Sequence, residues 1–195
     1  MTDFITSGTW DLGEPEKHRL EAALKEARGE RILDVGCRDG TFALTLAREH
    51  PEMHIAAFDT DASTLAWAER KAIESGLDNV TFWNLDVVSL KSTDGSFDGL
   101  TLGEHTFDTV YCMETFEHIA PNNFDRAYDN VIRFVRPGGR LVVTVPANSH
   151  ISDPDHKQTF YREVIYQNHP DLIWMKECPH LWIAWVMEFP DAKQG

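Results

Sequence analysis

Hydrophobic positions along the 195-residue chain alternate between short continuous runs and stretches with helical spacing. The runs RILDV (31–35), HIAAFD (54–59) and NVTFWNLD (79–86) have the length of buried strands. Between them, TFALTLAREH (41–50) and DASTLAWAERKAIESG (61–76) place apolar residues three and four apart, as helices do. Strands that alternate with helices predict an α/β fold, a doubly wound and mostly parallel sheet.

Start and stop signals frame these predicted helices. Pro15 is a favourable early helix residue and Gly29 a stop, which predicts a first helix over about residues 15–28. Asp61 is a candidate N-cap, and Gly76 is expected to end the helix that follows Asp61.

The second half of the chain begins with a polar loop, residues 89–105. Both SFDGL and TFDTV resemble the start of a strand, but only TFDTV continues into an apolar run. The fourth strand is therefore predicted at 107–112, with Asp98 in the loop. A helix over about 122–136 follows, then the turn RPGG and a fifth strand at 140–146.

The last apolar runs, DLIWMKEC (171–178) and HLWIAWVMEF (180–189), follow a short helix predicted within 159–168. Only Pro179 and His180 separate the apolar parts of the two runs, which is too short for a parallel crossover. They are therefore expected to form a C-terminal antiparallel hairpin on the Rossmann-like sheet.

Composition narrows the class of protein. The length suits a single domain over residues 1–195, and a net charge of −14 disfavours nucleic acid as a partner. The opening segment lacks the pattern of a signal peptide and no run is long enough to span a membrane, so a cytoplasmic protein is expected. The three cysteines are scattered without metal-binding spacing, which indicates reduced thiols.

Glycines after the first strand indicate a ligand site, because ligands in such sheets bind beyond the carboxyl ends of the strands. Gly36 and Gly40 lie there. A dinucleotide fingerprint from Gly36 would need glycines at Arg38 and Thr41, and the Gly-Lys-Ser/Thr ending of a phosphate loop is absent. The spacing disfavours both kinds of site.

The remaining pattern is Asp34-x-Gly36-x-x-x-Gly40, with Asp59 and Asp86 ending the next two strands. This pattern resembles the class I S-adenosylmethionine-dependent methyltransferases. The resemblance extends over about residues 31–161 through ILDVGCRDG, AAFDTD, NLDV, FDTVYCMETFEHI and VRPGGRLVVTVP, in the expected order. An arginine in place of the middle glycine of the family's first motif is the one departure.

The resemblance implies that S-adenosylmethionine is the cofactor. It implies a cofactor site formed by Asp34, Gly36, Cys37, Gly40, Asp59, Thr60, Asp86, Val87 and Cys112. In that site Asp59 would accept both ribose hydroxyls, as an ionised carboxylate can. Asp86 and the Val87 amide would bind adenine, and the Cys112 carbonyl would bind the amino end of the methionine part.

A second set of residues lies in METFEHIAP, which is expected to be helical. Glu114, Glu117 and His118 are spaced at i, i+3 and i+4, which would place them on one helix face, and SDPDHKQTFY supplies His156. The set resembles ubiquinone-biosynthesis O-methyltransferases and small-RNA 3′-end 2′-O-methyltransferases, in which a divalent metal binds the acceptor oxygen. His118 is the predicted catalytic residue, and these four residues are the predicted metal ligands. A solvated helix face, or a base that works without metal, is the alternative.

The predicted function is methyl transfer to an oxygen, less favourably a nitrogen, of a small-molecule acceptor. An RNA ribose 2′-O-methyltransferase is one alternative, which the acidic charge weakens. A non-catalytic module that binds S-adenosylmethionine, or a subunit that activates another methyltransferase, is the other, motivated by Arg38.

Overall fold

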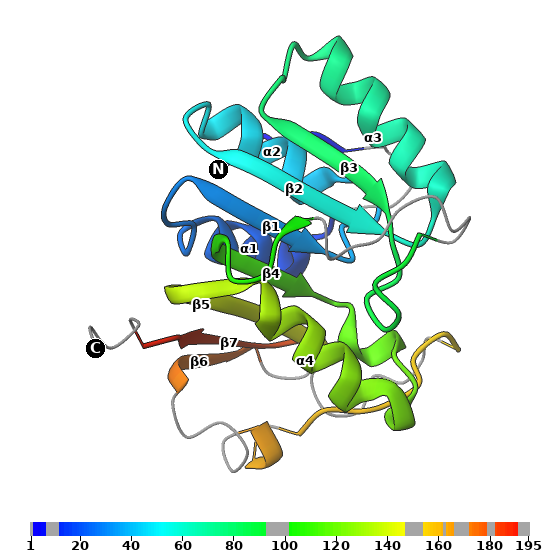
Figure 1. Ribbon diagram of the computed structural model, residues 1–195, viewed down its shortest axis with the longest axis vertical. Helices are drawn as coiled ribbons and strands as arrows, with labels where there is room; N and C mark the ends of the chain where they lie inside the picture. Colours follow the sequence, from blue (N-terminus) through cyan, green and yellow to red (C-terminus); the bar gives the residue numbers. More distant parts are fainter. Residues whose placement is uncertain are drawn as a thin grey trace.

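The structure, a computed structural model, describes residues 2–6, 12–92, 102–146, 154–161, 163–165, 172–178 and 182–190. Within these residues one seven-stranded sheet has the strand order β3-β2-β1-β4-β5-β7-β6 (Figure 1). Its strands are β1 (Arg31–Val35), β2 (His54–Asp59), β3 (Val80–Asn84), β4 (Phe107–Met113), β5 (Val135–Pro146), β6 (Leu172–Cys178) and β7 (Trp182–Glu188). The helices are α1 (Glu14–Leu24), α2 (Thr41–Glu49), α3 (Ala62–Glu74) and α4 (Phe124–Phe134), with short 3₁₀ helices η2 (Phe116–His118) and η3 (Pro121–Asn123).

Strands β1 to β5 are parallel, and the C-terminal hairpin is antiparallel, as the sequence predicts. β1 lies between β2 and β4, and its Val35 is in register with Phe58 of β2 on one side and with Cys112 of β4 on the other. The order of the parallel strands reverses at β1, so the crevice for a ligand lies beyond the carboxyl ends of β1 and β4.

Helices α1, α2 and α3 cover one face of the sheet, and α4 covers the other. Successive residues of a buried strand point to opposite faces and therefore pack in different core clusters. Ile32 packs in one core cluster with apolar residues of α1, α2 and α3. Leu33, the next residue, packs in the other cluster with Phe134 and its neighbours on α4. The doubly wound α/β prediction is confirmed (Figure 1).

The predicted boundaries hold for some elements and shift for others. Asp61 caps α3 as expected, since its side chain accepts hydrogen bonds from the amides of Ser63 and Thr64. α1 ends at Leu24 rather than near residue 28, and the chain reaches Gly29 (φ +77°) through non-helical turns. The RPGG segment belongs to the start of β5 and does not precede it as a separate turn.

The prediction of a helix over METFEHIAP is wrong. β4 continues to Met113, Glu114 takes a left-handed φ of +49°, and only the three residues of η2 are helical. Ala120 is extended with ψ 140°, as a residue before proline prefers, and Pro121 starts η3. Glu114 therefore does not share a helix face with Glu117 and His118.

Several expectations fall partly outside the described residues. The loop position Asp98 lies there, as do residues 162 and 166–168 of the helix expected within 159–168; of its described residues, 163–165 are helical. None of the described helices combines the length and the apolar character that a membrane crossing requires. A single domain over 1–195 stays a prediction.

Candidate functional site

A cavity of about 640 Å³ lies at the carboxyl ends of the central strands, within the size range of small-molecule sites. Most of the predicted site residues line this cavity: Asp34, Gly36, Cys37, Asp59, Thr60, Asp86, Val87, Glu114, Glu117, His118 and His156. Gly40 and Cys112 are not among its lining residues. Met113, one residue beyond Cys112, lines it because β4 extends to that position.

The turn between β1 and α2 forms one wall. Gly36 has φ +71°, and a Cβ atom there would lie 2.2 Å from Oγ1 of Thr115. Glycine is therefore required by the packing of Thr115 as well as by the backbone. Arg38 stands in the left-handed region (φ +52°) at the position where the family has a glycine.

Asp59 is held in place at the end of β2 by two backbone amides. Its Oδ2 accepts from the Arg38 amide at 2.8 Å, and its Oδ1 accepts from the Asp61 amide at 3.0 Å. A carboxylate has about four acceptor positions, so each oxygen can still accept a hydroxyl. Arg38 thus fixes Asp59 through its backbone, a contribution that its side chain type did not predict.

Asp34 is the most perturbed carboxyl group in the cavity. Burial, and secondly the negative charge of Asp59, raise the pKa of Asp34 from 3.8 to about 7. Its Oδ2 is buried and has no hydrogen-bond partner among the described residues. A buried carboxyl oxygen that faces a cavity without a donor favours a ligand that brings a donor or a positive charge.

Asp86 follows β3 and is partly engaged by its own turn. Its carboxylate accepts from the Val88 amide at 2.9 Å and from the Ser89 hydroxyl at 2.8 Å. The side-chain amide of Asn130 on α4 donates to the carbonyls of Val87 and Val88 at 2.8 and 3.0 Å. These bonds fix the backbone of residues 86–88 along the cavity.

Arg19 is a site residue that the sequence analysis missed. It lies on α1, is buried, and places Nη1 3.1 Å from Oε1 of Glu114 and 3.3 Å from Oγ1 of Thr144. The signal was present: Arg19 precedes Ala23 by four residues and therefore shares the buried face of that helix. It supplies the cavity with a cation beside several carboxylates.

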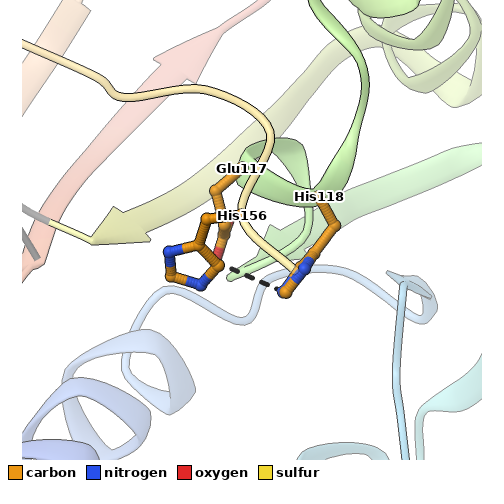
Figure 2. A group of neighbouring side chains, drawn as sticks. All are labelled: Glu117, His118 and His156. Atoms are coloured by element: carbon orange, nitrogen blue, oxygen red, sulfur yellow. Dashed lines mark ion pairs between the residues drawn. The ribbon is translucent and has the colours of Figure 1, made fainter. Parts of the chain in front are cut away.

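Glu117, His118 and His156 form the one group within the described part of the chain that could hold a metal ion. One ligand atom from each lies within 4.8 Å of the others. Figure 2 shows the three side chains converging, with His118 and Glu117 on η2 and His156 on the segment that crosses it. The Glu117 side chain is 2% exposed and that of His118 is 43% exposed, so the imidazole is open to a bound molecule.

Glu114 does not join this group, because the turn after β4 directs it to Arg19. The predicted four-ligand set is therefore not assembled in the structure. The thiol of Cys37 lines the cavity, but burial raises its pKa well above the usual range. It is therefore a neutral thiol and not a nucleophile.

The family model described as "Methyltransferase domain" matches residues 32–139, more than half of the chain. The chain therefore belongs to the methyltransferase-domain family, within the class I S-adenosylmethionine-dependent methyltransferases.

Two curated relatives carry more specific names. O-methyltransferase rstn1 of Aspergillus nomiae is 30% identical over 156 residues, which is 73% of this chain and 63% of the relative. The ubiquinone biosynthesis O-methyltransferase of Xylella fastidiosa is 31% identical over 151 residues, 72% of this chain and 55% of the relative. The chain thus spans 55% to 63% of these relatives' length.

Among solved structures, the [4+2]-cyclase SpnF superimposes with a TM-score of 0.75 at 17% identity. The match covers 96% of this chain and 85% of that protein. A likeness at this identity concerns the fold alone.

Proposed function

We propose that the chain transfers a methyl group from S-adenosylmethionine to an oxygen atom of a small-molecule acceptor. The observation that carries the proposal is that one cavity is lined both by Asp59, held by the β1–α2 turn, and by the group Glu117, His118 and His156. Asp59 is suited to bind the ribose of a nucleoside, and the group Glu117, His118 and His156 is suited to bind an acidic hydroxyl of the acceptor. The names of the O-methyltransferase relatives support oxygen as the accepting atom.

The lining of the cavity fits S-adenosylmethionine in charge as well as in hydrogen bonding. Asp59 would accept the ribose hydroxyls, and Asp86 would accept the adenine amino group. Asp34, whose buried Oδ2 has no donor among the described residues, would face the cationic part of the ligand. Arg19 would bind the carboxylate of the methionine part of the ligand, because a guanidinium offers two parallel donors.

When bound, S-adenosylmethionine supplies an electrophilic methyl group on a positively charged sulfonium. The residues of the chain then have to hold the acceptor in line and remove its proton. The exposed imidazole of His118 would accept that proton, and the buried Glu117 carboxylate lies 3.9 Å from its Nε2.

A divalent ion also fits Glu117, His118 and His156, since a carboxylate and two imidazoles suit manganese, iron, cobalt or zinc better than magnesium. Such an ion would supply positive charge that favours the deprotonated form of a hydroxyl. Glu114 is left out of this ligand set because it pairs with Arg19.

The charge of the lining bears on the acceptor. Carboxylates outnumber arginines around the cavity, and Glu114 already pairs with Arg19. A phosphate-bearing acceptor would meet a repulsive field there, which disfavours RNA and favours a small neutral acceptor with an acidic hydroxyl.

The test is transfer of labelled methyl from S-adenosylmethionine to a panel of phenols, with RNA oligonucleotides in parallel. The proposal expects a labelled phenol ether and an unlabelled RNA. Transfer to RNA alone would replace the small-molecule acceptor by a ribose hydroxyl. Binding of S-adenosylhomocysteine with no transfer to any acceptor would favour a non-catalytic module.

A further inference from the structure

His156 lies far from Glu117 and His118 in the sequence, so some contact must bring the two pieces together. The segment 154–158 reaches the cavity after β5 and crosses η2, as Figure 2 shows. The backbone amides of Lys157 and Gln158 both donate to the carbonyl of Glu117, at 2.6 and 3.3 Å. His118 in turn has Nδ1 3.4 Å from the carbonyl of Asp155.

The side chain of Gln158 completes this attachment. Its Nε2 donates to the carbonyl of Phe116 at 2.9 Å and to the carbonyl of Ile119 at 3.1 Å. These two carbonyls flank Glu117 and His118 on either side. A single side-chain amide therefore spans the backbone of η2 while its own backbone lies two residues from His156.

We infer that Gln158 is a positioning residue, which holds His156 against Glu117 and His118 and sets the orientation of the His118 ring. The inference rests on the proposed function, in which these three residues act on the acceptor. Gln158 itself does not line the cavity and does not belong to the group Glu117, His118 and His156. It acts through the two carbonyls of η2 and through the segment that carries His156.

The geometry supports Gln158 over the other anchor of this segment, Phe160. The Phe160 ring packs 5.7 Å from that of Phe124 on α4 and fixes the downstream end. Phe160 is four residues from His156, whereas Gln158 is two residues from it and bonds directly to η2, which carries the His118 ring 5.0 Å from that of His156. With its side-chain amide removed, Gln158 would leave the carbonyls of Phe116 and Ile119 without this donor, and only the backbone bonds to the Glu117 carbonyl would hold the segment to η2.

The test compares Gln158→Met, which keeps the length of the side chain but removes the donor, with Asn79→Leu. Asn79 is a matched control, because its amide also donates to backbone carbonyls, those of Ala47, His50 and Met53, away from the cavity. The measurements are Mn²⁺ affinity by electron paramagnetic resonance, S-adenosylhomocysteine affinity by calorimetry, and ¹⁵N-histidine NMR of the metal-free protein.

Gln158→Met is expected to lower Mn²⁺ affinity by about 10- to 100-fold, the usual effect of losing a residue that orients metal ligands. S-adenosylhomocysteine affinity should stay unchanged. The NMR signature of a proton on Nδ1 of His118, expected from its distance to the Asp155 carbonyl, should be lost. Asn79→Leu should lower thermal stability and change none of the three measurements.

Unchanged Mn²⁺ affinity and an unchanged histidine spectrum in Gln158→Met would overturn the inference. If the wild-type protein takes up no Mn²⁺, the metal part of the proposed function fails, and the histidine spectrum alone decides the role of Gln158. Should Gln158→Met fail to fold, Gln158→Glu keeps the size and planarity of the side chain, lacks the donor, and is judged by the same spectrum.

Discussion

Asp59 is oriented before any ligand binds, because the amides of Arg38 and Asp61 each hold one of its oxygens. Replacing Asp59 by alanine should weaken binding of S-adenosylhomocysteine by roughly 1.5–3 kcal/mol, the range for hydrogen bonds to a charged group. Calorimetric titration measures the change. Asp125→Ala, an exposed carboxylate in the first turn of α4, is the control and should bind as the wild type does. Equal dissociation constants for Asp59→Ala and the wild type would move the ribose contact elsewhere.

His118 should matter for transfer and not for cofactor binding. His118→Ala is expected to reduce methyl transfer by about 10²- to 10⁴-fold, the range for a group that moves a proton in the reaction. Its affinity for S-adenosylhomocysteine should stay that of the wild type. His54→Ala, which changes an exposed histidine at the start of β2, should leave both quantities unchanged.

A chelator separates the two roles open to His118. If Glu117, His118 and His156 hold a divalent ion, chelation should stop transfer and spare cofactor binding. If His118 is instead a metal-free base, the chelator should leave methyl transfer unchanged, and His118→Ala should abolish it. If methyl transfer survives both chelation and His118→Ala, the role of this part of the cavity is structural.

Asp34 links the free energy of unfolding to pH. Its pKa is raised from 3.8 to about 7 by burial and by Asp59, so in this window the folded state binds a proton that the unfolded state has released. Stability therefore falls as pH rises towards 7, and Asp34→Asn should remove that dependence. Between about pH 5 and pH 8 the variant should gain roughly 2.5 kcal/mol on the wild type. Urea unfolding at both pH values measures it.

The control for this pH effect is Asp78→Asn, an exposed carboxylate on the loop before β3. It should follow the wild type at both pH values. The same Asp34→Asn protein is expected to bind S-adenosylmethionine more weakly, since it lacks the negative charge that faces the cationic ligand. If Asp34→Asn gained no stability relative to the wild type between pH 5 and pH 8, Asp34 would be ionised at little cost in the fold.

The strands that carry this site were predictable from the sequence, whereas the turns that orient its side chains were not. The strand runs and the Asp61 cap are local signals, and the structure confirms them. METFEHIAP has helical spacing, yet β4 extends into it and Pro121 ends it, so spacing alone misplaced Glu114. Arg19 and Gln158 were missed because their partners, Glu114 and the carbonyls of η2, come from distant segments that only the fold brings together.

The turn between β1 and α2 offers a prediction with an internal control. Gly36 and Gly76 both have positive φ, +71° and +66°, but only Gly36 has a neighbour in the path of a Cβ atom. Gly76→Ala should cost about 1–2 kcal/mol for the left-handed backbone. Gly36→Ala should cost about 1–3 kcal/mol more, because Thr115 must shift. Thermal unfolding compares the two, and equal losses would mean that Thr115 yields without cost.

Over the entire chain, fold and family leave the reaction open. A solved structure named as a [4+2]-cyclase shares the architecture, and the chain spans only part of its curated relatives. The reaction therefore has to be inferred from the residues around the cavity. Here the carboxylates that suit a nucleoside and the group Glu117, His118 and His156 line the same space, and the proposed methyl transfer rests on this arrangement.

The choice of cofactor follows from how α2 begins. A dinucleotide places its pyrophosphate on the free amides of such a helix N-terminus. In this protein the buried carboxylate of Asp39 already occupies that position, accepting from the Thr41 hydroxyl at 2.8 Å and from the Thr41 amide at 3.2 Å. A second negative group would meet this carboxylate, whereas S-adenosylmethionine carries no phosphate.

S-adenosylmethionine and S-adenosylhomocysteine should therefore bind the purified protein, and NAD should give no saturable heat in the same calorimeter. S-adenosylmethionine should bind more tightly than S-adenosylhomocysteine, because its sulfonium adds a positive charge within a lining rich in carboxylates. That difference should shrink as salt is raised, since salt screens the partly exposed members of the lining. NAD that binds and displaces S-adenosylhomocysteine would show that Asp39 moves aside, and would contradict the cofactor assignment drawn from this turn.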